Sequence, residues 1–198
     1  MARQAERRAA TSAAILAAAR DLFRAEGYDA VSVDDIAAAA GVTKGAFYHH
    51  FATKQVIFDQ LVDLIQAEIA AQVAARPPTP GEGEDPMAAA IGAYLAAANQ
   101  PGVRRILLID GPVVLGWRRW RQIDDAHFAA MVRAGAARLM GPQASAAQVD
   151  AASRLILGAV MEAALAVGGA LGGADGEGLT AADYGAALSR LLRGLRPN

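Results

Sequence analysis

The stretch VDDIAAAAGVTKGAFYHHF, residues 33–51, decides the fold of the N-terminal part of this chain. It reads as two short helices joined by a tight turn, because Gly41 supplies a left-handed backbone conformation between two helix-forming runs. Ser32 is placed to cap the first helix and Thr43 to cap the second. Small Ala37 allows the two helices to approach closely. The pattern therefore predicts a helix-turn-helix.

The second helix of this motif has the composition of a helix that reads DNA. In the major groove, such a helix presents small polar groups and hydrogen-bond donors to base edges near its N-terminus. Hydroxyl and imidazole groups one turn later suit phosphate oxygens, and a lysine at the next helix start adds a cation. The sequence therefore predicts contact with double-stranded DNA through Thr43, Lys44, Gly45, Ala46, Tyr48, His49, His50 and Lys54.

The same residues have other interpretations. Two adjacent histidines do not make a metal site here, because neighbouring helical positions point about 100° apart and no third ligand lies nearby. Phe47 and Phe51 are expected in the core, and a buried core position is the alternative for Tyr48. Charge adds little support, because residues 1–60 hold seven Lys or Arg and seven Asp or Glu.

The flanking sequence predicts helices on both sides of the motif and an all-α chain. A first helix begins at Thr11 or Ser12 and ends before Gly27, while a long helix opens at Thr53 and reaches about Ala75. The stretch ARPPTPGEGEDPM, residues 75–87, cannot continue a helix and is expected to be a surface linker.

Composition excludes several classes of protein. The chain has 198 residues, of which 54 % are hydrophobic, so it is not a disordered protein. It contains no cysteine, which excludes disulfides, zinc–thiolate sites and a thiol nucleophile. The N-terminal apolar stretch is too short to span a membrane and lacks a signal-peptide cleavage region. We expect a cytoplasmic protein with no membrane association, no metal and no cofactor.

The motifs of residues 18–62, AARDLFRAEGYDAVSVDDIAAAAGVTKGAFYHHFATKQVIFDQLV, resemble the DNA-binding domain of the TetR (tetracycline-repressor-like) family of transcriptional regulators. They include Phe-x-x-x-Gly-Tyr at the end of the first helix, Ala-x-x-x-Gly-Val in the turn, Tyr-x-His-Phe in the reading helix, and a lysine that starts the fourth. By position, the resemblance adds Ser32 and Val33 to the expected DNA contacts. Asp34 stands where some relatives carry a basic, base-reading residue.

The resemblance implies two domains, both all-α. A DNA-binding domain over residues 9–69 contains the helix-turn-helix at 32–51, and residues 70–198 form a domain for ligand binding and dimerisation. It also implies a repressor that a small-molecule effector releases from a palindromic operator.

The C-terminal part offers candidates for the effector pocket. Helices are expected to break near Pro101 and around Gly111 and Pro112, and one ends at Gly141. On helical spacing, a set of aromatic, histidine and methionine side chains falls roughly on one face, although each residue could equally be ordinary core. The candidates for the unidentified effector's pocket are Tyr94, Trp117, Trp120, His127, Phe128, Met131 and Met161.

The last two helices are the expected dimer interface, because one has small residues along one side and the other has leucines. The residues predicted for this four-helix contact between two chains are Ala159, Ala163, Tyr184, Leu188 and Leu191. Burial of the same residues within one protomer is the alternative.

Two further functional classes were considered. An enzyme is disfavoured, because the sequence shows no acid–base pair, no nucleophile–histidine pairing and no phosphate loop. A constitutive DNA-binding protein without an effector remains the alternative to a ligand-responsive repressor.

Overall fold

The computed structural model describes residues 2–75, 85–167 and 179–197, and over these ranges it contains helices and no strand. The chain divides into two compact units. We call Met1–Ile65 with Pro101–Trp120 the first unit, and Gln66–Gln100 with Arg121–Asn198 the second unit. The segment Pro101–Trp120, expected in the C-terminal domain, therefore clusters with the N-terminal helices. Most of the predicted linker, residues 76–84, lies outside the described residues.

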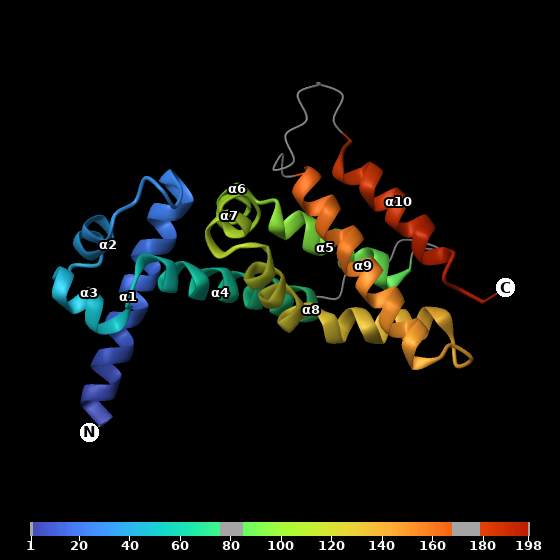
Figure 1. Ribbon diagram of the computed structural model, residues 1–198, viewed down its shortest axis with the longest axis horizontal. Coiled ribbons are helices and arrows are strands. Elements are labelled where there is room, and N and C mark those ends of the chain that lie inside the picture. Colours follow the sequence, from blue (N-terminus) through green and yellow to red (C-terminus); the bar gives the residue numbers. More distant parts are fainter. Residues whose placement is uncertain (1, 76–84, 168–178, 198) are drawn as a thin grey trace. The chain divides into compact units, whose positions relative to one another are not determined.

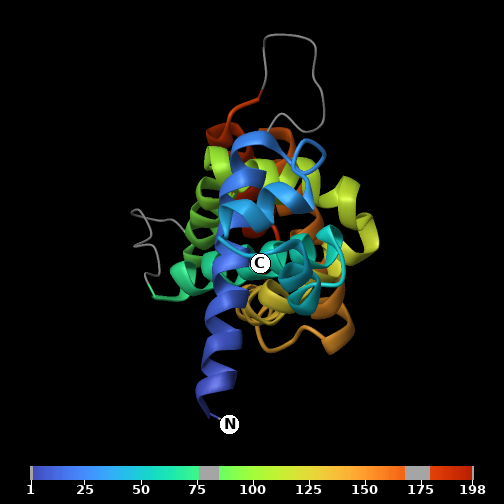
Figure 2. The same ribbon diagram turned by 90° about the vertical axis from the view of Figure 1, so that its left-hand side faces the viewer.

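The N-terminal helices follow the predicted order. They are α1 (Ala2–Glu26), α2 (Val33–Ala39), α3 (Lys44–His50) and α4 (Lys54–Ala75). The predicted start of α1 at Thr11 or Ser12 was wrong, because the Thr11 hydroxyl donates to Arg7 O at 3.0 Å inside the helix and caps nothing. Figures 1 and 2 show the N-terminal turns of α1 extending past α2 and α3.

The helix ends around the motif are built as the sequence predicted. Thr43 Oγ1 accepts a hydrogen bond from the Ala46 backbone N–H at 3.1 Å and so caps α3. Gly41, with φ of 66°, turns the chain between α2 and α3. Phe47 and Phe51 are buried, as expected. Phe47 thereby anchors one side of α3 in the core and leaves the other side outward.

The segment that joins the first unit from later in the chain closes the end of α1. It comprises α6 (Pro101–Arg104), a π-helical stretch η1 (Arg105–Asp110) and α7 (Gly111–Leu115). Arg105 Nη2 donates to Glu26 O at 2.8 Å, and Asp110 Oδ2 accepts from the Tyr28 backbone N–H at 2.9 Å. These contacts satisfy backbone groups that the end of α1 leaves open.

The helical breaks in this segment differ in part from the prediction. α6 does begin at Pro101, and the next long helix does end at Gly141 with φ of 76°. Around Gly111 and Pro112, however, the backbone stays helical, and the break comes at Gly116, where φ is 74°. Proline is compatible with the first turn of a helix, where its missing N–H has no intrahelical partner, so Pro112 lies in the first turn of α7.

The second unit is a bundle built from the remaining helices. It contains α5 (Pro86–Ala98), most of α8 (Trp117–Met140), α9 (Ala146–Val167) and α10 (Ala181–Arg193), with the C-terminal part of α4. α5 packs against α9 and α10. α10 also packs against α9, and these two helices lie side by side in Figure 1.

Candidate nucleic-acid interface and ligand cavity

The outward side of α3 carries the residues predicted to read DNA. Thr43, Lys44, Gly45, Tyr48 and His49 are exposed, while Ala46 and His50 are half-buried. The Tyr48 side chain is 50 % exposed, so the alternative of a buried core tyrosine is wrong. Its ring contacts the buried Phe47 ring edge-on at 5.5 Å between centroids, which orients the hydroxyl end away from the core. α3 therefore presents a polar surface on a rigidly anchored helix.

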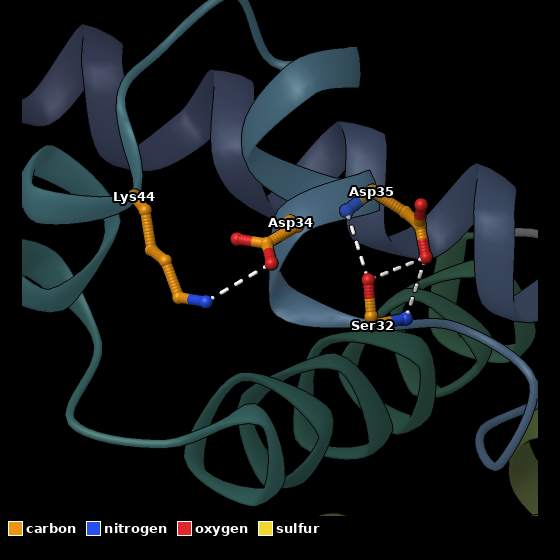
Figure 3. Close-up of polar contacts among 4 residues, drawn as sticks. All are labelled: Ser32, Asp34, Asp35 and Lys44. Atoms are coloured by element: carbon orange, nitrogen blue, oxygen red, sulfur yellow. Dashed lines mark hydrogen bonds and ion pairs between the residues drawn. The ribbon is translucent and has the colours of Figure 1, made fainter.

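An ion pair joins the two helices of the motif at this surface. Lys44 Nζ lies 2.9 Å from Asp34 Oδ2, and both side chains are more than half exposed (Figure 3). The hydrogen bond that Lys44 donates to Asp34, together with the charge of Asp34, raises the pKa of Lys44. In the DNA-free protein, the Lys44 ammonium, which the sequence assigns to base reading, is therefore already paired with an acidic group.

The second acid of α2, Asp35, has a structural task. The Ser32 backbone N–H and hydroxyl both donate to Asp35 Oδ2, at 2.8 and 2.6 Å, and Ser32 Oγ accepts from the Asp35 backbone N–H (Figure 3). This reciprocal capping box lowers the pKa of Asp35 through the Ser32 hydrogen bonds. Ser32 is exposed, but its hydroxyl hydrogen is already engaged by Asp35.

Lys54 was predicted to contact a phosphate, but its ammonium lies against the protein's own backbone. Its Nζ donates to Tyr28 O and Val31 O, both at 2.8 Å, and lies 4.1 Å from the centroid of the Tyr28 ring. The half-buried side chain thus binds the loop between α1 and α2. A lysine at the start of a helix can satisfy the protein's own carbonyls as well as a ligand's oxygens, and sequence alone does not separate the two.

Substitution of Lys54 by Met is expected to lower the free energy of unfolding by about 2 kcal/mol, because two carbonyls lose a charged donor. Urea unfolding followed by circular dichroism measures this, with Lys44→Met, which removes an exposed lysine, as the matched control. A phosphate-binding Lys54 would show the opposite pattern: unchanged stability and a smaller dependence of DNA affinity on salt.

The second unit contains a cavity of about 230 Å³. Four of the predicted pocket residues line it, namely Tyr94, Phe128, Met131 and Met161. α5 and α9 supply much of the remaining wall. The other lining residues are Pro86, Met87, Ala90, Ile91, Asp124, Val132, Ala134, Gly135, Arg138, Leu157 and Val160.

Three predicted pocket residues do not line this cavity. Trp120 is fully buried in the core of the first unit, where its Nε1 donates to Leu107 O at 2.8 Å. Trp117, one turn earlier, is 56 % exposed and also belongs to the first unit. His127 is half-buried and is absent from the cavity wall. Helical periodicity placed these residues near Phe128, but α8 changes packing partners between Trp120 and Arg121.

The cavity residues that were not among the predicted candidates differ in how far the sequence indicates them. Asp124 falls on the same helical face as Phe128 and Met131 in the sequence, although it was not among the candidates. The α5 contributors, such as Met87 and Ile91, belong to a helix so rich in alanine that no single face stands out. Their place on the cavity wall is visible only in the folded unit.

A buried polar cluster borders the cavity, with Tyr94 and Asp124 on the wall and Gln66 behind them. Gln66 Nε2 donates to Asp124 Oδ1 at 3.1 Å, and the Tyr94 hydroxyl donates to the same oxygen at 3.4 Å. Asp124 is 4 % exposed, and burial raises the pKa of its carboxyl to about 6. Burial also raises the pKa of Tyr94, so its hydroxyl stays protonated. The cluster holds a carboxylate that is ionised at neutral pH against an otherwise apolar space.

The predicted dimer residues fall into two groups. Ala163 is 0 % exposed within the single chain and belongs to the protomer's own core, so its assignment to the dimer contact is corrected; Leu188 is 5 % exposed but also lines the groove between α9 and α10. Leu191 is 64 % exposed, while Ala159 and Tyr184 are half-buried. Leu191, Ala159 and the 74 % exposed Leu155 line an apolar groove of about 400 Å³ between α9 and α10.

Across the described ranges, none of the helices combines the length and hydropathy that a membrane crossing needs.

Comparison with known proteins identifies two matching family models. Residues 15–61 match the model described as bacterial regulatory proteins, tetR family. Residues 85–195 match the model described as tetracyclin repressor-like, C-terminal domain. The two matches cover the helix-turn-helix and the bundle that holds the cavity.

Individual relatives agree with these matches. A solved TetR-family transcriptional regulator from Pectobacterium atrosepticum is 31 % identical, with a TM-score of 0.77 over 98 % of this chain and 97 % of that one. The transposon Tn10 TetC protein of Escherichia coli is 50 % identical over 52 residues, which are 26 % of each chain. The regulator TcmR of Streptomyces glaucescens is 30 % identical over 101 residues, or 51 % of this chain and 43 % of TcmR. The alignments to these two curated relatives thus span only a quarter to less than half of their length.

Proposed function

Since this chain belongs to the TetR family of bacterial regulatory proteins and is a helix-turn-helix transcriptional regulator, we propose that it is a homodimeric repressor released from its operator by a small molecule. It acts in the cytoplasm, where it binds a near-palindromic duplex. Because the relatives named above are transcriptional regulators, a catalytic role is not part of this proposal.

The observation that carries the proposal is the exposed polar surface of α3, anchored from behind by Phe47 and capped by Thr43. A helix held in this way can enter the major groove as a rigid body. The proposed DNA contacts are the residues of this surface and of the start of α2: Ser32, Val33, Thr43, Lys44, Gly45, Ala46, Tyr48, His49 and His50. Lys54 is left out because its donors serve the protein backbone.

The experiment that tests the proposal is selection of bound duplexes from a random-sequence DNA pool by the full-length protein. Enrichment of a near-palindrome is expected, because two copies of α3 related by a two-fold axis read the same half-site twice. Recovery of DNA without any shared motif would contradict sequence-specific regulation.

Lys44 and Tyr48 are expected to act differently on the selected operator. Lys44→Ala should cost about 1–3 kcal/mol of binding free energy and relax the preference at one base pair, because its ammonium reaches a base edge once it leaves Asp34. Tyr48→Phe should weaken all duplexes to a similar degree, because its hydroxyl meets a phosphate. Fluorescence anisotropy on the operator and on single-base variants measures both effects.

Equal loss of discrimination in the two variants would contradict these assignments. Asp34→Asn serves as a companion variant, because it keeps the shape of the side chain and removes its charge. It is expected to strengthen binding to all duplexes, since it removes an acid beside the DNA and frees Lys44.

The cavity supports the second half of the proposal, release by a small molecule. It is apolar, partly enclosed and supplied with a few polar groups, which is the pattern of a ligand site. α4 contributes Lys54–Ile65 to the first unit and residues 66–75 to the second, so one continuous helix enters both. A hundredfold loss of operator affinity on ligand binding requires about 2.7 kcal/mol of differential affinity between two states of the protein.

A further inference from the structure

The cavity of the second unit has the dimensions of a small ligand. Its volume is about 230 Å³. An apolar cavity of about 150 Å³ in a protein core is enough to bind benzene. A single ring with a short substituent therefore fits.

The lining of the cavity is apolar except at three places. Most of the wall consists of aliphatic side chains, methionines and the Phe128 ring, which meets the Tyr94 ring edge-on at 5.0 Å between centroids. The polar exceptions are the Tyr94 hydroxyl, the Asp124 carboxylate and Arg138. Arg138 is exposed, whereas Asp124 is almost completely buried. The only buried charge on the described wall is therefore negative.

The Asp124 carboxylate has unused capacity to accept hydrogen bonds. Gln66 Nε2 and the Tyr94 hydroxyl both donate to Oδ1, and these two bonds use only part of the roughly four acceptor sites of an ionised carboxylate. Arg121, the nearby cation that favours the ionised form, makes its ion pair with Asp125 at 3.1 Å. Asp124 is thus a buried carboxylate on the cavity wall, and burying a charge is costly unless an opposite charge compensates it.

Gln66 shows the same deficiency. Its Oε1 is buried and has no hydrogen-bond partner among the described residues. Exchanging the amide nitrogen and oxygen would not remove the problem, because it would place Oε1 against the Asp124 carboxylate and lose the bond at 3.1 Å. Gln66 Oε1 therefore lacks a donor, and it belongs to the side chain that bonds Asp124.

We propose that this cavity binds a small hydrophobic cation, a single ring carrying a protonated amine, with the ammonium on Asp124 and the ring among Phe128, Met131 and Met161. The inference rests on the proposed function for the role of this ligand as effector, but not for its binding. An ammonium supplies donors and the missing positive charge together, and charge-assisted hydrogen bonds are about twice as strong as neutral ones. A carboxylate ligand of the same size would meet the Asp124 charge and be excluded.

The test uses three probes of matched shape on the full-length protein without DNA: 2-phenylethylamine, 2-phenylethanol and phenylacetate. Isothermal titration calorimetry at neutral pH is expected to show about tenfold or more tighter binding of the amine than of the alcohol, and no binding of the carboxylate. Asp124→Asn should remove the preference for the amine and leave binding of the alcohol nearly unchanged. Asp150→Asn, which removes an acid from the exposed ion pair with Arg133 in the same unit, is the control and should keep the preference.

Equal affinities for amine and alcohol, a preference that survives in Asp124→Asn, or no binding of any probe at millimolar concentration would overturn the proposal. Circular dichroism shows whether Asp124→Asn is folded, and Asp124→Ser provides a second variant without the charge. Operator binding is measured separately. If the amine binds through Asp124 but does not release DNA, the inference stands and the effector role in the proposed function fails.

Discussion

Replacement of Trp120 by Ala is expected to lower the free energy of unfolding by about 3–5 kcal/mol, the usual cost of truncating a large buried aromatic side chain. Trp120 is fully buried, and its Nε1 donates to Leu107 O in the middle of η1. The substitution removes both the ring and this donor and leaves a void beside Gly111, at which an added Cβ would lie 3.0 Å from the indole. Trp120 therefore supports the segment that closes the end of α1.

Trp117→Ala is the matched comparison, and it is expected to cost about 1 kcal/mol or less. Trp117 is 56 % exposed, and its one aromatic partner among the described residues is Trp120, at 5.1 Å between centroids. Urea unfolding followed by far-ultraviolet circular dichroism compares the two variants without relying on tryptophan fluorescence. Similar losses of stability in the two variants would contradict the difference in burial between Trp117 and Trp120. Neither variant should change binding of 2-phenylethylamine, because neither residue lines the cavity.

Replacement of Leu191 by Glu is expected to weaken the dimer about a thousandfold, or about 4 kcal/mol. Leu191 lies exposed in the apolar groove between α9 and α10, the surface that we propose meets a second copy of the chain. In a two-fold interface, the substitution places one charge from each protomer in an apolar contact, at a cost of about 2 kcal/mol each. Analytical ultracentrifugation measures the dissociation constant.

Operator affinity should fall together with dimerisation, because two reading helices spaced by about one DNA turn, roughly 34 Å, must be held by one dimer. Val113→Glu is the control, since Val113 is 80 % exposed in the first unit, outside the groove. A Leu191→Glu protein that remains dimeric would remove this groove from the interface. Leu188→Glu cannot make the test, because Leu188 is buried in the protomer and its substitution would damage the fold.

Local chemistry made the helix-turn-helix predictable. Ser32 and Thr43 cap helices through their own hydroxyl groups, and Gly41 turns the chain where a side chain would be strained. Each of these signals acts over three or four residues, so it can be read without knowing what packs nearby. The start of α1 was missed for a related reason. Thr11 has the residue type of a cap, but a favourable helical run continues on both sides of it, and its hydroxyl bonds within the helix.

The cavity was predictable only in part. Periodicity correctly grouped Phe128 and Met131, which follow each other by three residues on α8 and share the cavity wall. It could not show that Trp117 and Trp120, on the same helix, pack in the other unit. Hydrophobic spacing identifies which residues share a face, but not which partner covers that face.

The sequence by itself determined the all-α class, the reading motif and the family, because these depend on local capping, turn conformation and helical spacing. Tertiary structure decided which polar groups are available for function. Lys54 is taken by two carbonyls of the loop after α1, Lys44 is paired with Asp34 across the motif, and Asp124 is buried on the wall of an apolar cavity. A charged side chain reaches several ångströms, so its partner is chosen by whatever the folded chain brings within that distance, and no local rule specifies it.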